Sequence, residues 1–185
     1  MTSPTYAEII DGHYTKNWSA PTKAVRWTLG PIGELPNDFR VLVLQRATDM
    51  VAFATRCMSQ AADEDRLEIH VLCRPDDAGR TDLVEILTAV AHYHRSGSAL
   101  GLGHSINFGK PWVPGSACSF GVVSLPYLDG PDLEWLAEPP VRFLWLIPVT
   151  QAEIAFKKAY GMEALEERFE AAQFNFLDPF RPSVV

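Results

Sequence analysis

The longest hydrophobic run of the chain, Phe143 to Val149, limits the folds that this sequence can adopt. Its length suits a strand that is buried on both faces, whereas a membrane span needs about 18 or more apolar residues. The expected strand, over 141–149, leads directly into Thr150-Gln151-Ala152-Glu153. This is a capping-box pattern, in which the Thr150 hydroxyl accepts from the Glu153 amide and the Glu153 carboxylate accepts in return. The sequence therefore predicts a core strand followed at once by a helix, which Gly161 ends.

Three further strands are predicted before the first long helix. Residues 39–44 form a continuous apolar run, 51–57 alternate less regularly, and 66–74 alternate well, with Glu68 and His70 opposite the apolar side chains. Short loops between these strands favour antiparallel pairing. We expect helices over 5–18, from Thr81 or Asp82 to about 96, and over 162–172, a short strand near 24–28, and an extended tail over 175–185. The predicted fold class is α+β, a mixed α/β sandwich whose central, mostly antiparallel β-sheet is packed by helices.

Composition narrows the function classes. The 185 residues suffice for one well-cored domain, and the formal net charge of −7 argues against nucleic acid as a partner. An acidic surface suits a basic protein partner, but it serves solubility equally well. Residues 1–8 lack the basic and apolar regions of an export signal, and Cys57, Cys73 and Cys118 are odd in number. We therefore expect a cytoplasmic protein with reduced thiols and no membrane partner; the sequence makes no prediction of oligomeric state.

The motifs of common enzymes are missing from the sequence. There is no phosphate-binding loop, and Gly101-Leu102-Gly103 lacks the third glycine of a dinucleotide fingerprint. His92 and His94 would point roughly 200° apart on a helix, so they do not predict a metal site. We expect no catalytic residue, no cofactor and no metal. One enzymatic alternative stays open, a nucleophilic site built from Cys118 and His104.

The glycine- and proline-rich stretch over 100–116 is the strongest candidate for a functional segment. It follows the predicted long helix and carries two large aromatic residues. Ordered loops on rigid scaffolds often mediate recognition, but a loop can also cover the core with its aromatic side chains. Both interpretations stay open for its candidate partner-binding or structural residues, which are Gly103, His104, Phe108, Pro111, Trp112, Gly115 and Ser116.

Several segments together resemble the suppressor-of-fused domain family. They are Ala91-His92-Tyr93, Gly103-His104 leading to Pro111-Trp112, the segment 122–127, the segment 141–153 and the ending 178–185. No single motif is specific, but their order and spacing are. The resemblance covers about 38–185, so we expect a suppressor-of-fused-like domain there, of the bacterial single-domain type. Residues 1–37 are expected to form an N-terminal helix and turn-rich extension of one compact unit.

The resemblance implies a mixed α/β sandwich that binds other proteins and carries no catalytic residues. In animals the family restrains a transcription factor by closing two lobes around a peptide, and this chain has room for one lobe. Bacterial single-domain members are regarded as immunity proteins that neutralise toxins. The first hypothesis is thus an immunity protein against a polymorphic toxin, for which a basic, nuclease-like toxin would suit the acidic charge. The alternative is a scaffold or regulator of an endogenous client protein, such as a transcription factor.

Overall fold

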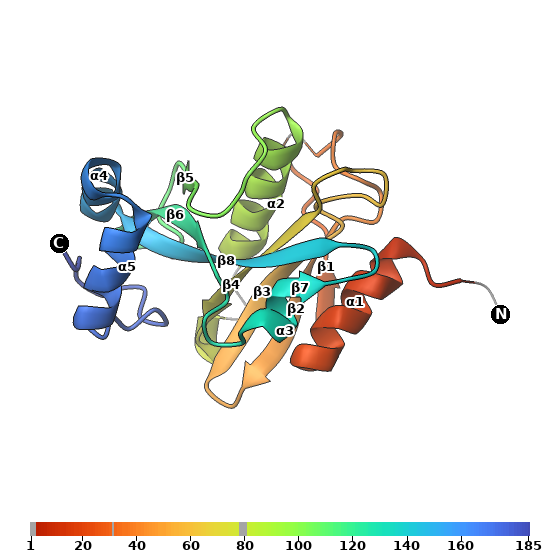
Figure 1. Cartoon of the computed structure of the whole chain (residues 1–185), viewed down its shortest axis with the longest axis horizontal. Coiled ribbons are helices and arrows are strands. Elements are labelled where there is room, and N and C mark those ends of the chain that lie inside the picture. Colours follow the sequence, from red (N-terminus) through yellow and green to blue (C-terminus); the bar gives the residue numbers. More distant parts are fainter. Residues whose placement is uncertain (1–2, 31, 78–80) are drawn as a thin grey trace.

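The protein is built on one open, twisted sheet, with helices on both faces (Figure 1). The computed structural model describes residues 3–30, 32–77 and 81–185. The sheet has eight strands in the order β1-β2-β3-β4-β8-β6-β5, and β7 pairs with β8 outside this path. Every described strand pair is antiparallel except β4 with β8, which confirms the predicted α+β class with a mostly antiparallel sheet.

The strands are β1 (Lys23–Val25), β2 (Arg40–Ala47), β3 (Met50–Arg56), β4 (Leu67–Cys73), β5 (Ser105–Asn107), β6 (Cys118–Ser124), β7 (Trp135–Leu136) and β8 (Val141–Thr150). The helices are α1 (Tyr6–Asn17), α2 (Thr81–Arg95), α3 (Pro131–Glu134), α4 (Gln151–Tyr160), α5 (Met162–Ala171) and the 3-10 turn η1 (Pro75–Asp77). The elements that were predicted agree with these bounds to within a few residues, whereas no bounds were predicted for β5, β6, β7, α3 and η1. No helix within the described ranges has both the length and the apolar character needed to cross a membrane.

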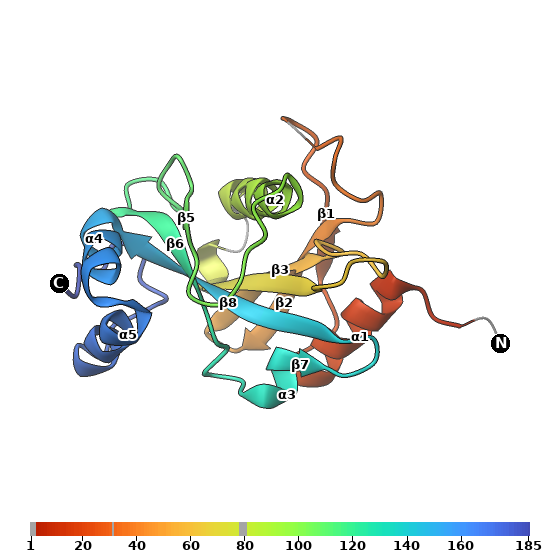
Figure 2. The same ribbon diagram turned by 45° about the horizontal axis from the view of Figure 1, so that its top comes forward.

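Helix α2 covers one face of the sheet, and α1, α3 and α5 lie on the other (Figure 2). The apolar side of α2, including Leu83, Leu87 and Val90, packs on alternate residues of β2, β3, β4 and β8. Helix α1 buries Ile10 and Tyr14 against the opposite face. With helices on both faces, all the side chains of β8 except that of Arg142 are buried, which explains its continuous apolar run.

Burial on both faces also extends to β4, where the sequence placed two polar residues opposite the apolar ones. Glu68 and His70 do face away from Ile69, but both are buried. Glu68 accepts hydrogen bonds from Thr55 Oγ1 at 2.6 Å and Met58 N at 3.1 Å, and burial raises its pKa to about 7. Burial, followed by the positive charge of Arg46, lowers the pKa of His70 to about 3. The alternation in β4 therefore reflects two buried faces of the sheet, one lined by apolar side chains and the other by Glu68 and His70.

Capping boxes precede two of the predicted helices. At α4 the capping box is present, with Thr150 Oγ1 and the Glu153 carboxylate each accepting from the other's amide. At α1, Thr5 is the N-cap and forms a second capping box with Glu8, so the helix predicted over 5–18 begins at Tyr6. The residue before Thr81, which would cap α2, lies outside the described residues.

The N-terminal segment contacts the sheet directly. Strand β1 pairs with β2, Asp11 forms an ion pair with Arg56 at 2.9 Å, and His13 Nε2 lies 2.8 Å from the Leu133 carbonyl. The division of the chain at residue 37 stays a prediction. These contacts join the segment to β2, β3 and α3.

Candidate functional site

The glycine-rich loop is attached along its length to strand β6. Gly103 N donates to the Val123 carbonyl at 2.8 Å and Val123 N donates to the His104 carbonyl at 2.9 Å. Further along, Phe108 N and Trp112 N donate to the carbonyls of residues 119 and 118. The Lys110 side chain connects the loop to α2 through ion pairs with Asp82 and Glu85. Its backbone is therefore positioned by the sheet and by α2.

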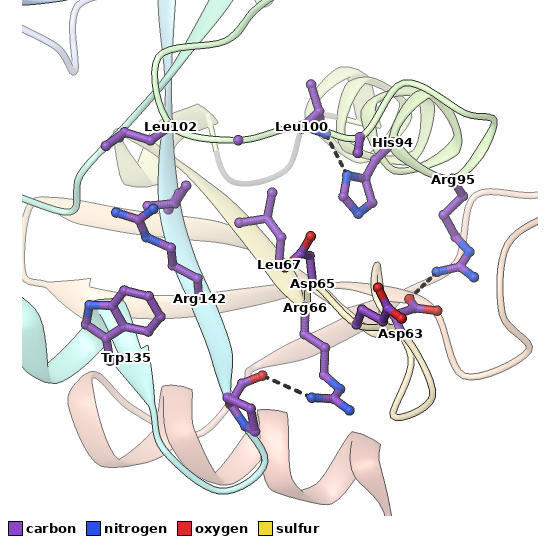
Figure 3. Close-up of a pocket in the computed structure, with 15 residues that line it drawn as sticks. Asp63, Asp65, Arg66, Leu67, His94, Arg95, Leu100, Leu102, Trp135 and Arg142 are labelled. Carbon is purple, nitrogen blue, oxygen red and sulfur yellow. Dashed lines mark hydrogen bonds and ion pairs between the residues drawn. The ribbon is translucent and has the colours of Figure 1, made fainter.

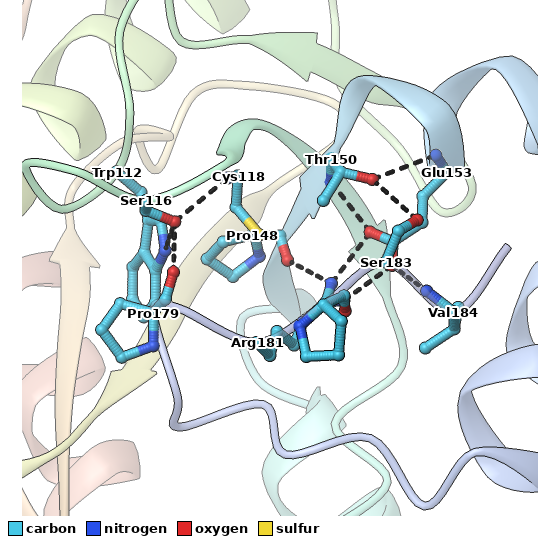
Figure 4. Close-up of polar contacts among 11 residues, drawn as sticks. Trp112, Ser116, Cys118, Pro148, Thr150, Glu153, Pro179, Arg181, Ser183 and Val184 are labelled. Carbon is cyan, nitrogen blue, oxygen red and sulfur yellow. Dashed lines mark hydrogen bonds and ion pairs between the residues drawn. The ribbon is translucent and has the colours of Figure 1, made fainter.

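The later half of the loop, residues 106–118, is an anchor in the core (Figure 4). Trp112 is 2% exposed, and its Nε1 donates to Ser116 Oγ at 3.1 Å. The buried Ser116 hydroxyl also accepts from Cys118 N at 3.0 Å and donates to the Pro179 carbonyl. These contacts place Trp112 and Ser116 in the core, as the interpretation of a core-covering loop requires.

The C-terminal tail is held beside this anchor by a buried ion pair (Figure 4). Arg181 donates to both Glu153 oxygens, at 2.6 and 2.9 Å, and to the Pro148 carbonyl at 3.1 Å. Val184 N donates to Glu153 as well. Although burial alone would raise the pKa of Glu153, the Arg181 guanidinium holds it below its usual value. Glu153, which completes the capping box of α4, thus also holds the C-terminal tail in place.

Phe108 belongs to the same buried half, because Gly121 makes room for it. A Cβ at Gly121 would lie 2.6 Å from both Phe108 Cζ and Leu146 Cδ1, which is too close. The Phe108 ring therefore rests directly on the backbone of β6. Of the other candidates, Pro111 and Gly115 are exposed, and Gly115 turns the chain with φ +86°.

The earlier half of the loop, residues 99–105, is exposed or half-buried except at Leu100, which is buried. Gly101 to His104 form a tight turn closed by His104 N on the Gly101 carbonyl at 3.1 Å, with Gly103 at φ +78°. His104 is exposed, and Leu102 is 43% exposed. The structure therefore separates Gly103 and His104 from the buried Trp112 and Ser116.

A cleft of about 560 Å³ lies beside this open half, bounded by the loop over 61–66, the end of α2 and β7 (Figure 3). Leu67, Leu100 and Leu144 contribute an apolar lining. Trp135 is 53% exposed at the rim, and the Arg142 guanidinium lies 5.0 Å from its ring centroid while bonding Glu134. The cleft thus presents an aromatic ring and a fixed guanidinium beside apolar side chains. The charged side chains of residues 63–66 and Arg95 also line it.

The structure does not bring together the residues of the enzymatic alternative. Cys118 and Val123 are five positions apart on β6, and His104 bonds Val123, so the two candidates are separated by roughly 16 Å of strand. Burial raises the pKa of the Cys118 thiol, which disfavours a reactive thiolate. Cys57 and Cys73 are also buried, each with a pKa raised to about 12. Within the described part of the chain, no group of three or more His, Cys, Asp or Glu side chains could hold a metal ion.

These features define an α+β domain on a single open sheet, with a cleft of about 560 Å³ beside the glycine-rich loop. The family described as Suppressor of fused protein (SUFU) matches residues 39–182. The chain belongs to the suppressor of fused family, as its sequence resemblance indicated. In eukaryotes this family is a protein-binding regulator.

Solved structures agree with this assignment. A SUFU homolog from Neisseria gonorrhoeae FA 1090 is similar over 97% of both chains, with 30% identity and a TM-score of 0.84. A chain of the Sufu–Fu complex matches 99% of this chain over 93% of its own length, with 14% identity and a TM-score of 0.71. Drosophila Suppressor of Fused matches 78% of this chain over 39% of its own length, with 12% identity and a TM-score of 0.54. The last two show the fold alone. A search of curated proteins gave no match.

Trp135 and Arg142 are the cleft residues that sequence reasoning missed. Trp135 stands on the two-residue strand β7, and only the pairing of β7 with β8 brings it beside Arg142. The available signal was an arginine at the start of the most apolar strand, where a charge is out of place unless it faces the surface.

Proposed function

We propose that this protein is a non-catalytic protein-binding domain that holds its partner in the cleft beside the open half of the glycine-rich loop. The observation that carries the proposal is the combination of an exposed Trp135 with an apolar lining in a cleft of about 560 Å³. Tryptophan and arginine are enriched among the residues that dominate protein interfaces. An exposed Trp next to a fixed Arg142 has the composition of an interface anchor.

The specific role proposed is that of an immunity protein that neutralises a toxin domain in the cytoplasm. The support is the net charge of −7, which favours association with a basic, nuclease-like toxin. The alternative, a regulator of an endogenous client, is supported by the family's role in eukaryotes. The two roles use the same cleft and differ in the identity of the partner.

The test is affinity capture from the host of the protein, with wild type and two matched variants. Leu102→Asp places a charge at the cleft, and Leu29→Asp places the same charge at a more exposed leucine that does not line it. We expect a stoichiometric partner with wild type and Leu29→Asp, and its loss with Leu102→Asp. A captured toxin domain supports the immunity role if co-expression with this protein also protects cells from it. Capture of a host regulator supports the alternative. If Leu102→Asp captures the partner as well as wild type does, the partner does not bind in the cleft.

A further inference from the structure

A second, smaller hollow of about 380 Å³ lies on the other side of the open half of the loop. It shares Ala99 and Leu100 with the cleft, so the same short segment separates the two. Its lining residues come from α2, the loop, β5 and α4, and they are Tyr93, Ser98, Ala99, Leu100, Gly103, His104, Ser105 and Lys157. No acidic residue lines it, although the whole chain carries a net charge of −7.

The Lys157 ammonium is the only fixed charge in this hollow. It is part-buried, and its Nζ donates to Ser105 Oγ at 3.0 Å. Among the described residues no carboxylate forms an ion pair with it, whereas the neighbouring loop lysine, Lys110, has two. Burial, and then the adjacent Lys158, lower the pKa of Lys157. The ammonium is thus held partly out of water without an anion to balance it.

The other lining groups suit an anion too. The Ser98 and Tyr93 hydroxyls can donate hydrogen bonds, and the exposed His104 ring stands at the rim. A lone cation among hydrogen-bond donors is complementary to a carboxylate.

We propose that this hollow receives an aspartate or glutamate side chain of the bound partner, which pairs with Lys157. The inference rests on the proposed protein-binding function and adds the chemistry of the partner at one point. Long-range attraction by the acidic chain draws in a basic partner, and the pairing of one of its acidic side chains with Lys157 then orients it. The net negative charge of the chain thus attracts the partner, and the positive charge of Lys157 sets the partner's orientation.

A displayed library of random twelve-residue peptides tests this inference without a known partner. Selection on the wild-type protein is compared with selection on Lys157→Gln and Lys158→Gln, which remove the same charge from adjacent positions of α4. We expect wild type and Lys158→Gln to enrich peptides with an acidic residue at one fixed position. Lys157→Gln should lose that enrichment and bind the selected peptides about tenfold more weakly. Lys157→Arg should retain most of the affinity.

The outcomes separate this inference from the proposed function. Peptides without a preferred acidic position, no enriched peptide at all, or equal losses in the two glutamine variants would each overturn the carboxylate site. Replacing the acidic residue of a selected peptide by phosphoserine gives another check, because a clear preference for phosphate would also overturn the assignment. If affinity capture depends on Leu102 but not on Lys157, the protein-binding function stands and the carboxylate site fails.

Discussion

The two halves of the glycine-rich loop each carry two glycines but have different surroundings. Residues 99–105 form an exposed turn between two hollows, whereas residues 106–118 carry Trp112 and Ser116 into the core. The buried half is attached to β6, to α2 and to the tail, so it can hold the open half in place. A recognition loop with a buried anchor loses less conformational entropy on binding than a mobile one.

The largest expected effect comes from removing the anchor itself. Trp112→Ala deletes a fully packed side chain and leaves a cavity, so the free energy of unfolding should fall by about 3–5 kcal/mol. Chemical denaturation with a fluorescence readout measures it. Trp112→Phe retains most of the packing and should lose less. If Trp112→Ala were as stable as wild type, the division into buried and open halves would be wrong.

The ion pair behind the anchor should have the next largest effect. Arg181→Met removes the partner of a fully buried Glu153 carboxylate, which should cost about 3 kcal/mol in the free energy of unfolding. Arg74→Met, at an exposed arginine whose ion pair with Asp178 spans 3.9 Å, is the control and should change stability little. If both variants changed the free energy of unfolding by the same small amount, the Arg181–Glu153 ion pair would not contribute to stability.

The same ion pair predicts a pH dependence. Because the folded pKa of Glu153 lies below its ordinary value of 4.5, the unfolded chain binds this proton more tightly than the folded protein. The contribution is complete above about pH 4.5 and is lost as the pH falls through the folded pKa. The stability difference between wild type and Glu153→Gln should therefore shrink below pH 4.5. A difference that stays constant from pH 7 to pH 3 would contradict this linkage.

A smaller effect is expected in the open half. Gly103→Ala forces a Cβ into a left-handed conformation, at a cost of about 1–2 kcal/mol, and a Cβ there lies 4.0 Å from Met162 without a clash. We expect a small fall in melting temperature together with weaker partner capture, since the turn would shift. Gly109→Ala, at φ +73°, is the matched control and should lower stability similarly without affecting capture.

The smallest effect on stability should come from the exposed histidine. His104→Ala should change the free energy of unfolding by less than about 0.5 kcal/mol, because the side chain is exposed at the rim of the hollow. Partner affinity is the sensitive readout. A destabilisation comparable to that of Trp112→Ala would place His104 with the anchor.

The sequence did not separate the buried half of the glycine-rich loop from the open half. It left open whether the loop covers the core or binds a partner. Local patterns predicted β8, the Thr150 capping box and the break at Gly161, because each depends on neighbouring residues. The burial of Glu68 could not be predicted, since α1, far away in the chain, covers it. The same reason hid the pairing of Glu153 with Arg181, whose positions differ by 28.

The site shows the same limit. Composition singled out the loop as a candidate, but which half is buried depends on Gly121 and on the tail, and both lie outside the loop. Trp135 gave no local signal, because β7 has only two residues and reaches the cleft by pairing with β8. Tertiary contacts between distant segments decided each of these positions.

Hydrogen–deuterium exchange of the protein, free and bound to its captured partner, tests the central claim most directly. The account predicts slower exchange on binding at residues 99–105 and around Trp135. It predicts no change at Trp112, Ser116 and Cys118, whose amides are already hydrogen-bonded in the free protein. Slower exchange confined to other surfaces, with residues 99–105 and Trp135 unaffected, would contradict the claim that the open half of the loop and its cleft bind the partner.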